Sequence, residues 1–190
     1  FGIYAYVFVI VTLLGLAFSI GFNSSTLRFA SSYLARKKTR RLSGFLRQSY
    51  GIVLGLSLLG ALLSAGLIVA FRDIIEPYYV EPLLVGLLCV PVWTVLNQCE
   101  ATARALGWVN IAYIPGYILR PLLVTAFVGL LVLLGGTADA VAALWAMIAA
   151  CTIAALIQGF LVYSGSRRYL AKVKPTFHTR HWFAISFGFL

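Results

Sequence analysis

Long apolar runs separated by short polar segments dominate this chain. Five runs are long enough to cross a bilayer, since a spanning helix needs about 20 apolar residues; they cover residues 1–22, 50–71, 83–103, 111–134 and 141–163. A sixth run, 182–190, is too short to span by itself. The pattern predicts an all-α polytopic membrane protein, a helical bundle of about five complete transmembrane helices and the start of a sixth. Because the chain begins with Phe1 and ends inside an apolar run, we expect it to be part of a longer protein.

Composition supports the membrane class. Hydrophobic residues make up 62% of the chain and charged residues only 11%, compared with roughly 25% charged residues in an ordinary soluble domain. The three cysteines lie in apolar runs, at spacings that match neither a disulfide framework nor a metal site. We therefore expect small buried cysteines, no metal and no cofactor.

The basic residues predict an orientation. Two predicted loops, 26–49 and 164–181, hold seven and five of the 15 Lys and Arg residues, whereas the connectors on the other side hold one and none. By the positive-inside rule these basic loops face the cytoplasm and the Phe1 end lies outside. Such loops attract anionic membrane lipids. Nucleic-acid binding is not expected, because the charge is divided between juxtamembrane segments.

Several short motifs carry a resemblance to a known family. The opening FGIYAY, the segment GFNSSTLRFASSYLARKK, RALG at 104–107 and LRPLL at 119–123 resemble the bacterial polysaccharide and O-antigen flippases of the multidrug/oligosaccharidyl-lipid/polysaccharide exporter superfamily. The resemblance implies one partial lobe of a two-lobed, MATE-like transporter. It also implies transport of an undecaprenyl-diphosphate-linked oligosaccharide across the bacterial inner membrane by alternating access, coupled to H⁺ or Na⁺ if to any ion.

One segment inside the apolar region carries charge. Asn97, Glu100 and Arg104 are spaced at i, i+3 and i+7, so a helix places them on one face, with Glu100 one turn before Arg104 in the favourable order for an ion pair. Two interpretations remain open. The pair either neutralises two charges near the cytoplasmic end of the span or forms part of a cavity wall.

Arg120 is the second candidate. It lies nine residues into the predicted span 111–134, roughly 13 Å along the helix axis and so near the middle of the hydrocarbon layer. Helical spacing places Tyr113, Gly116 and Tyr117 on the same face. An aromatic cavity wall could meet sugar rings while the guanidinium binds pyrophosphate oxygens. Alternatively, Arg120 pairs with an acidic residue of the missing lobe and only holds helices together.

Arg28 is the third candidate, at the inner end of the first span. It is either an interfacial cation that extends toward the headgroups or a site that gathers the carrier lipid's diphosphate from the inner leaflet.

Other function classes fit less well. The five acidic residues form no pair within one loop, whereas a glycan-assembly enzyme needs paired carboxylates or a base near its substrate, so no catalytic residue is expected. A cation-coupled multidrug exporter of the same superfamily needs carboxylates inside the membrane. Glu100 is the only acidic residue within a predicted span, whereas Arg120 lies within one span and Arg104 directly follows another. This balance favours an anionic substrate.

Overall fold

The computed structural model describes residues 2–136, 139–170 and 182, and among these it contains helices and no strand. In chain order the helices are α1 (Gly2–Phe18), α2 (Phe22–Ala35), α3 (Thr39–Ala70), α4 (Pro77–Ala105), α5 (Val109–Tyr113), the π-helix η1 (Ile114–Leu119), α6 (Arg120–Leu133) and α7 (Ala140–Leu170). Four described segments are long and apolar enough to cross a membrane, or five if the bent pair α1 and α2 forms one span. The prediction of an all-α polytopic membrane protein is confirmed.

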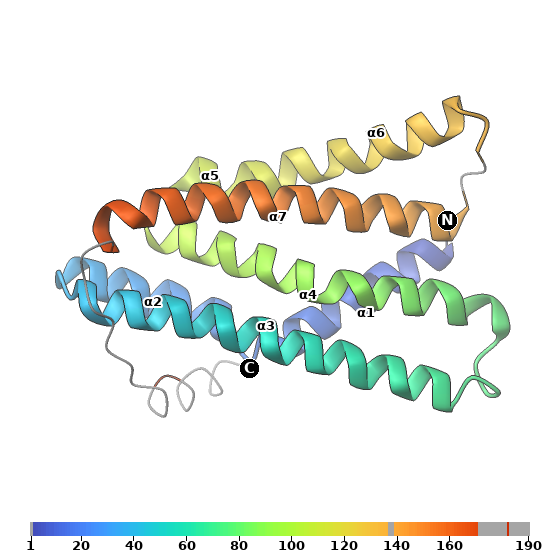
Figure 1. Ribbon diagram of the computed structural model, residues 1–190, viewed down its shortest axis with the longest axis horizontal. Helices are drawn as coiled ribbons and strands as arrows, with labels where there is room; N and C mark the ends of the chain where they lie inside the picture. Colours follow the sequence, from blue (N-terminus) through green and yellow to red (C-terminus); the bar gives the residue numbers. More distant parts are fainter. Residues whose placement is uncertain (1, 137–138, 171–181, 183–190) are drawn as a thin grey trace.

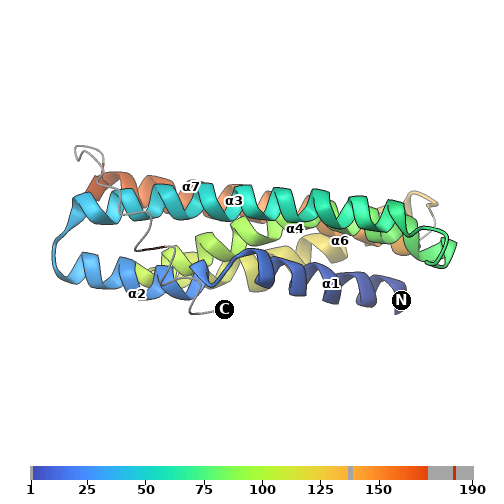
Figure 2. The same cartoon turned by 90° about the horizontal axis from the view of Figure 1, so that it is seen from below.

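Helix α4 is the centre of the bundle. It packs against α1, α2, α3, α5 and α7, whereas α6 packs mainly against α7. In Figure 1 the helices run side by side along the long axis, and in Figure 2 α3 and α7 lie on one side of α4 while α1, α2 and α6 lie on the other. Apolar side chains of α1, α4 and α7 form the largest buried cluster; they include Val7, Val11, Leu87, Val90, Leu144 and Met147. Close packing of this kind holds helices together where lipid tails are as apolar as the side chains.

Helices α1 and α4 approach closely at Gly86. A Cβ atom at this position would collide with a side-chain methyl group of Val7. The absence of a side chain at Gly86 therefore allows the two helix backbones to come together, as small residues do in membrane bundles.

The predicted basic loop 26–49 is largely helical, and this part of the prediction is wrong. Helix α2 runs to Ala35 and α3 begins at Thr39, so only a short turn at 36–38 separates them. Hydropathy marks where a helix is apolar, not where it ends, and these helices continue into polar sequence. The predicted loop 164–181 likewise begins as helix, because α7 extends to Leu170; residues 171–181 lie outside the described part.

The first predicted span, 1–22, is also shorter than expected. Helix α1 ends at Phe18 and α2 starts at Phe22, with a bend of 50° between them. At the bend Gly21 has a φ angle of 65°, a left-handed conformation that glycine adopts without steric cost. Residues 23–25, which directly follow the predicted span and are polar, lie inside α2.

Of the predicted partial span 182–190, only Trp182 is described. Its ring packs edge-on against Phe45 of α3, with 5.3 Å between the centroids. Its indole Nε1–H donates a hydrogen bond of 3.0 Å to the Tyr33 hydroxyl of α2. Trp182 is thereby buried against α2 and α3.

The segment 109–133 is interrupted by the π-helix η1, which contains Pro115. Within η1 the hydrogen bonds join residues five positions apart, as between the Arg120 N–H and the Pro115 carbonyl. Pro115 has no N–H, so the carbonyl of Ile111 lacks its α-helical donor. The buried side chain of Gln158 in α7 replaces it, since its Nε2 donates to the carbonyls of Ile111 at 2.8 Å and Ala112 at 2.9 Å. Freed backbone groups inside membranes are satisfied by neighbouring helices in this way.

This arrangement predicts a coupling between Gln158 and Pro115. Gln158→Leu should lower the free energy of unfolding by about 1–2 kcal/mol, because two buried carbonyls lose their donor. In a Pro115→Ala background the loss should be smaller, since residue 115 then supplies an N–H to Ile111. Chemical unfolding of the full protein in detergent would measure all four variants of the cycle. Equal losses in both backgrounds would contradict this account.

Candidate anion-binding site on helix α4

A polar stripe runs along one face of α4. It consists of Trp93, Asn97, Glu100 and Arg104, which follow one another at spacings of three or four residues and therefore lie on the same side of the helix. The stripe starts near the middle of α4 and ends at its C-terminal turn. The predicted common face of Asn97, Glu100 and Arg104 is thus present, and Asn97 is half-buried on it.

Glu100 and Arg104 form the ion pair that their spacing predicts. Arg104 Nη1 lies 3.4 Å from Glu100 Oε1. The Glu100 side chain is 16% exposed and that of Arg104 41% exposed. The Arg104 guanidinium also lies 6.0 Å from the ring centroid of Tyr113. Arg104 therefore has a carboxylate partner, which favours the interpretation that the two charges neutralise each other.

Arg120 is in a different situation. It is the twelfth of the 25 residues in the candidate span Val109–Leu133 and is half-buried. Its guanidinium carbon lies 4.5 Å from the ring centroid of Trp93 and 5.9 Å from that of Phe8. All five acidic residues belong to the described part, and none of them forms an ion pair with Arg120. The charge at mid-span is therefore held by aromatic rings of α1 and α4 rather than by a carboxylate.

This geometry leaves Arg120 able to bind an anion. Contact with an aromatic ring uses the flat face of a guanidinium, whereas the N–H donors lie along its edge. Two parallel N–H groups match the spacing of carboxylate or phosphate oxygens. An unneutralised cation inside an apolar layer is the feature that a polar, anionic solute would recognise.

The tyrosines near Arg120 follow a different register from the one expected. The predicted alignment of Tyr113, Gly116 and Tyr117 with Arg120 assumed a regular α-helix, but η1 interrupts it at 114–119. The rings of Tyr113 and Tyr117 lie 5.7 Å apart, and their residues are 39% and 64% exposed. They form an exposed aromatic pair beside Arg104.

Sequence reasoning missed the two rings that contact Arg120. Trp93 could have been found, because it precedes Asn97 by four residues and so extends the same stripe. Phe8 gave no such signal, since it belongs to a helix more than one hundred residues away in the sequence. Its position depends on how α1 packs against α4.

Arg28 lies on a different helix from the stripe, on an exposed position of α2. Close to it in the sequence, Thr26 takes part in a buried polar contact that was not predicted. Gln98 of α4 donates hydrogen bonds from Nε2 to Thr26 Oγ1 at 2.9 Å and to Ser49 Oγ of α3 at 3.1 Å. Gln98 thus fastens α2 and α3 to the side of α4 that faces away from the stripe.

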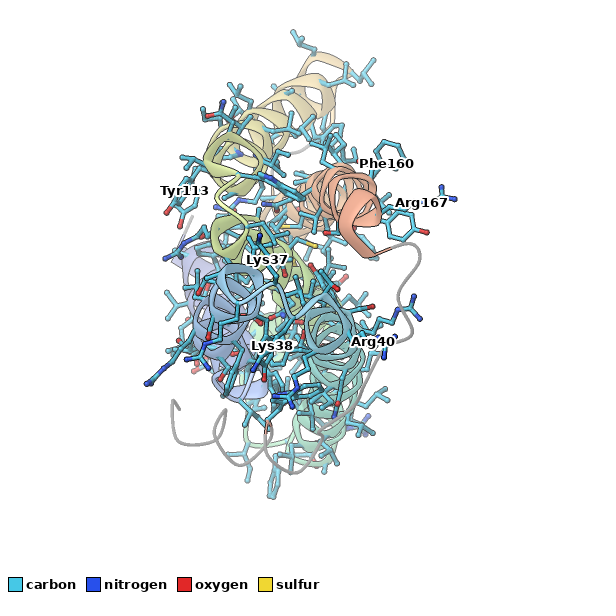
Figure 3. The ribbon with its side chains drawn as sticks, turned by 90° about the vertical axis from the view of Figure 1, so that its left-hand side faces the viewer. Lys37, Lys38, Arg40, Tyr113, Phe160 and Arg167 are labelled. Carbon is cyan, nitrogen blue, oxygen red and sulfur yellow. The ribbon has the colours of Figure 1, made fainter. Side chains whose placement is uncertain are left out.

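Apart from Arg120, the described charged side chains lie toward the two ends of the bundle. The α2–α3 turn, the C-terminal ends of α4 and α7 and the start of α5 lie at one end, where Figure 3 shows Lys37, Lys38, Arg40 and Arg167. The α3–α4 and α6–α7 connections lie at the other end; they carry Arg72, Asp73, Glu76 and Asp139. The stripe therefore leads from mid-span to the basic end.

Metal chemistry has no visible basis in the described residues. No group of three or more His, Cys, Asp and Glu side chains among them could hold a metal ion. Cys89, Cys99 and Cys151 are free thiols and buried.

No protein-family model matches the chain, and no significant match was found among curated proteins or solved structures. Its function must therefore be inferred from the residues themselves. The most informative of these are the mid-span cation, the stripe and the basic end.

The different surroundings of the two arginines predict opposite effects of the same substitution. Arg120→Met should keep the free energy of unfolding unchanged or raise it by about 1 kcal/mol. The reason is that burying an arginine at mid-span costs roughly 2.5–3.5 kcal/mol, whereas a cation–π contact returns only about 0.5–2 kcal/mol. Arg104→Met should lower stability by about 1 kcal/mol, because Glu100 loses its partner.

Unfolding of both variants in the same detergent would measure this difference, with each variant serving as the control for the other. A loss of more than about 1 kcal/mol in Arg120→Met would mean that Arg120 mainly holds the helices together.

Proposed function

We propose that this chain is part of a membrane flippase that moves a lipid-linked oligosaccharide, carried on undecaprenyl diphosphate, across the membrane. The observation that carries the proposal is Arg120, a half-buried cation at mid-span that rests on Trp93 and Phe8 without a carboxylate partner among the described residues. Retaining such a charge is costly. A negatively charged substrate that passes through the membrane explains why the charge is retained in spite of its energetic cost.

The stripe suggests how the substrate would move. A diphosphate group arriving from the basic end would first meet the Arg104 region and then, about halfway along α4, the guanidinium of Arg120. The exposed rings of Tyr113 and Tyr117 offer apolar faces on which sugar rings can pack. In this proposal Arg120 binds phosphate oxygens, and Asn97, halfway between, offers an amide for hydrogen bonding.

The proposed setting is the bacterial inner membrane, with the basic end in the cytoplasm and the Phe1 end outside. The gathering of Lys and Arg at one end of the bundle supports this orientation under the positive-inside rule. A second lobe, needed for alternating access, would lie in a longer protein. Membrane lipids and a coupling ion, H⁺ or Na⁺, are further partners in this proposal.

A cation-coupled drug exporter is the nearest alternative. It would use an ionisable carboxylate inside the membrane to carry protons or sodium. Glu100 is the only acid within the predicted spans, and its side chain is engaged by Arg104 at 3.4 Å. That pairing favours the flippase proposal.

Complementation of a flippase-deficient strain tests the role of Arg120. The full-length protein carrying Arg120→Ala should fail to restore surface glycan, because the mid-span anion site is lost. Arg120→Lys should restore it only in small part, since an ammonium group keeps the charge but lacks the fork. Surface glycan should be quantified at equal protein level in the membrane.

Arg72→Ala is the matched control, because it removes one arginine from an exposed position. Arg72 lies in the α3–α4 connection, at the end of the bundle opposite to the basic end. It should behave as the unmodified protein does. Normal surface glycan with Arg120→Ala would remove the assigned role of Arg120.

Cysteine labelling tests the proposed orientation. Lys37 and Ile74 are both exposed and lie at opposite ends of the bundle. A cysteine introduced at either position should differ from the other in its reaction with a membrane-impermeant maleimide in intact cells. Ile74→Cys should react directly, and Lys37→Cys only after the inner membrane is permeabilised. The buried native cysteines should give a low background. The reverse pattern would invert the topology.

A further inference from the structure

A cavity lies between α3, α4 and α7, at the basic end of the bundle. Its volume is about 520 Å³. Its lining includes Cys99 and Thr102 of α4, which lie on the side of that helix opposite to Asn97, Glu100 and Arg104, given about 100° of rotation per residue. In Figure 3 Tyr113, beside the stripe, and Arg167, at the cavity, lie on opposite sides of the bundle. The cavity is therefore separate from the candidate site on the stripe.

Two cations border this cavity. Arg47 of α3 and Arg167 of α7 both line it and are exposed. Neither makes a hydrogen bond or an ion pair with another described residue. None of the five acidic residues of the chain lines the cavity. The local charge is therefore positive and uncompensated.

Two hydroxyl groups in the cavity lack hydrogen-bond partners although they are buried. Ser43 is 1% exposed, and its Oγ atom, like that of Ser166, has no partner. Both serines line the cavity. Buried polar atoms are nearly always hydrogen-bonded, so two unsatisfied hydroxyls beside two arginines indicate a ligand with several acceptor oxygens. A phosphate group has this character.

The position of the cavity indicates that a lipid carries this group. Arg167 lies four residues beyond the apolar run 141–163 of α7, which places the arginine near the membrane boundary. Tyr163, one turn deeper, lines the cavity and is 66% exposed, as is typical of aromatic residues at the headgroup level. The apolar side chains of Leu46 and Val162 complete this part of the lining. A phosphate would thus meet the arginines while an acyl chain lies along the apolar wall.

We propose that the cavity between α3, α4 and α7 binds the phosphate headgroup of an anionic membrane lipid from the leaflet at the basic end. Arg47 and Arg167 bind the phosphate oxygens from two sides, and the hydroxyls of Ser43 and Ser166 donate hydrogen bonds to them. The bound lipid joins α7 to α3. This site does not depend on the proposed transport function, because none of its residues belongs to the stripe.

Lipid titration of the purified full-length protein tests the proposal. Phosphatidylglycerol binding, measured by native mass spectrometry from detergent, should weaken at least about tenfold in Arg47→Ala/Arg167→Ala, because two charge-assisted contacts are lost. The control Arg36→Ala/Arg40→Ala removes the same charge from the same end, at exposed residues outside the cavity lining. Its affinity should change less than about twofold.

Two further measurements keep the result interpretable. Ser43→Ala should leave the thermal stability unchanged, since the hydroxyl has no partner in the protein, and should weaken phosphatidylglycerol binding about threefold. Phosphatidylcholine and inorganic phosphate should compete poorly.

Equal weakening in both arginine pairs would overturn the proposal in favour of diffuse attraction to the basic end. Unchanged binding by Ser43→Ala would overturn the role of its hydroxyl, and effective competition by inorganic phosphate would overturn the assignment to a lipid.

Discussion

Hydrocarbon offers no hydrogen bonds, so each polar group that these helices bury must find its partner inside the protein or remain costly. The Nε2 group of Gln98 meets this requirement with the hydroxyls of Thr26 and Ser49, and that of Gln158 with two backbone carbonyls, whereas the Oε1 atoms of both side chains lack a partner among the described residues. Each of these contacts joins helices that are distant in the sequence, so the need to satisfy polar atoms also determines which helices are neighbours. Arg120 is a half-buried charged group without a carboxylate partner among the described residues. Its aromatic neighbours stabilise the charge but do not neutralise it.

Helix α4 contributes residues to both the stripe and the cavity, because other helices pack around it on most sides. On one side it carries the stripe, in which Trp93 contacts Arg120 of α6, and toward α3 and α7 it forms the wall of the cavity that contains Arg47 and Arg167. The two proposed anion sites therefore share one helix but not one surface. A diphosphate on the stripe and a lipid phosphate in the cavity could be bound at the same time, with α4 between them.

The sequence was sufficient for the fold class and for local contacts. Apolar runs mark membrane helices because length and hydropathy are the requirements for crossing, and the Glu100–Arg104 pair follows from helical spacing alone. The extension of helices through 26–49 was missed because their polar ends resemble loops in hydropathy. The contact of Arg120 with Phe8 could not be predicted, since it depends on the packing of α1 and on the register change in η1. Pro115 within an apolar run was the available signal for that change.

The π-helix has a geometric consequence for the chain that follows it. A wider turn accommodates residues that a regular α-helix would advance by about 100° each, so η1 sets the rotational phase of α6 relative to α5. A regular α-helix over the same residues would turn the Arg120 side chain by about 100° away from the Trp93 ring, although neither Arg120 nor Trp93 would have been altered. The backbone form of residues 114–119 is thus as much a part of the cation's placement as the identity of its neighbours.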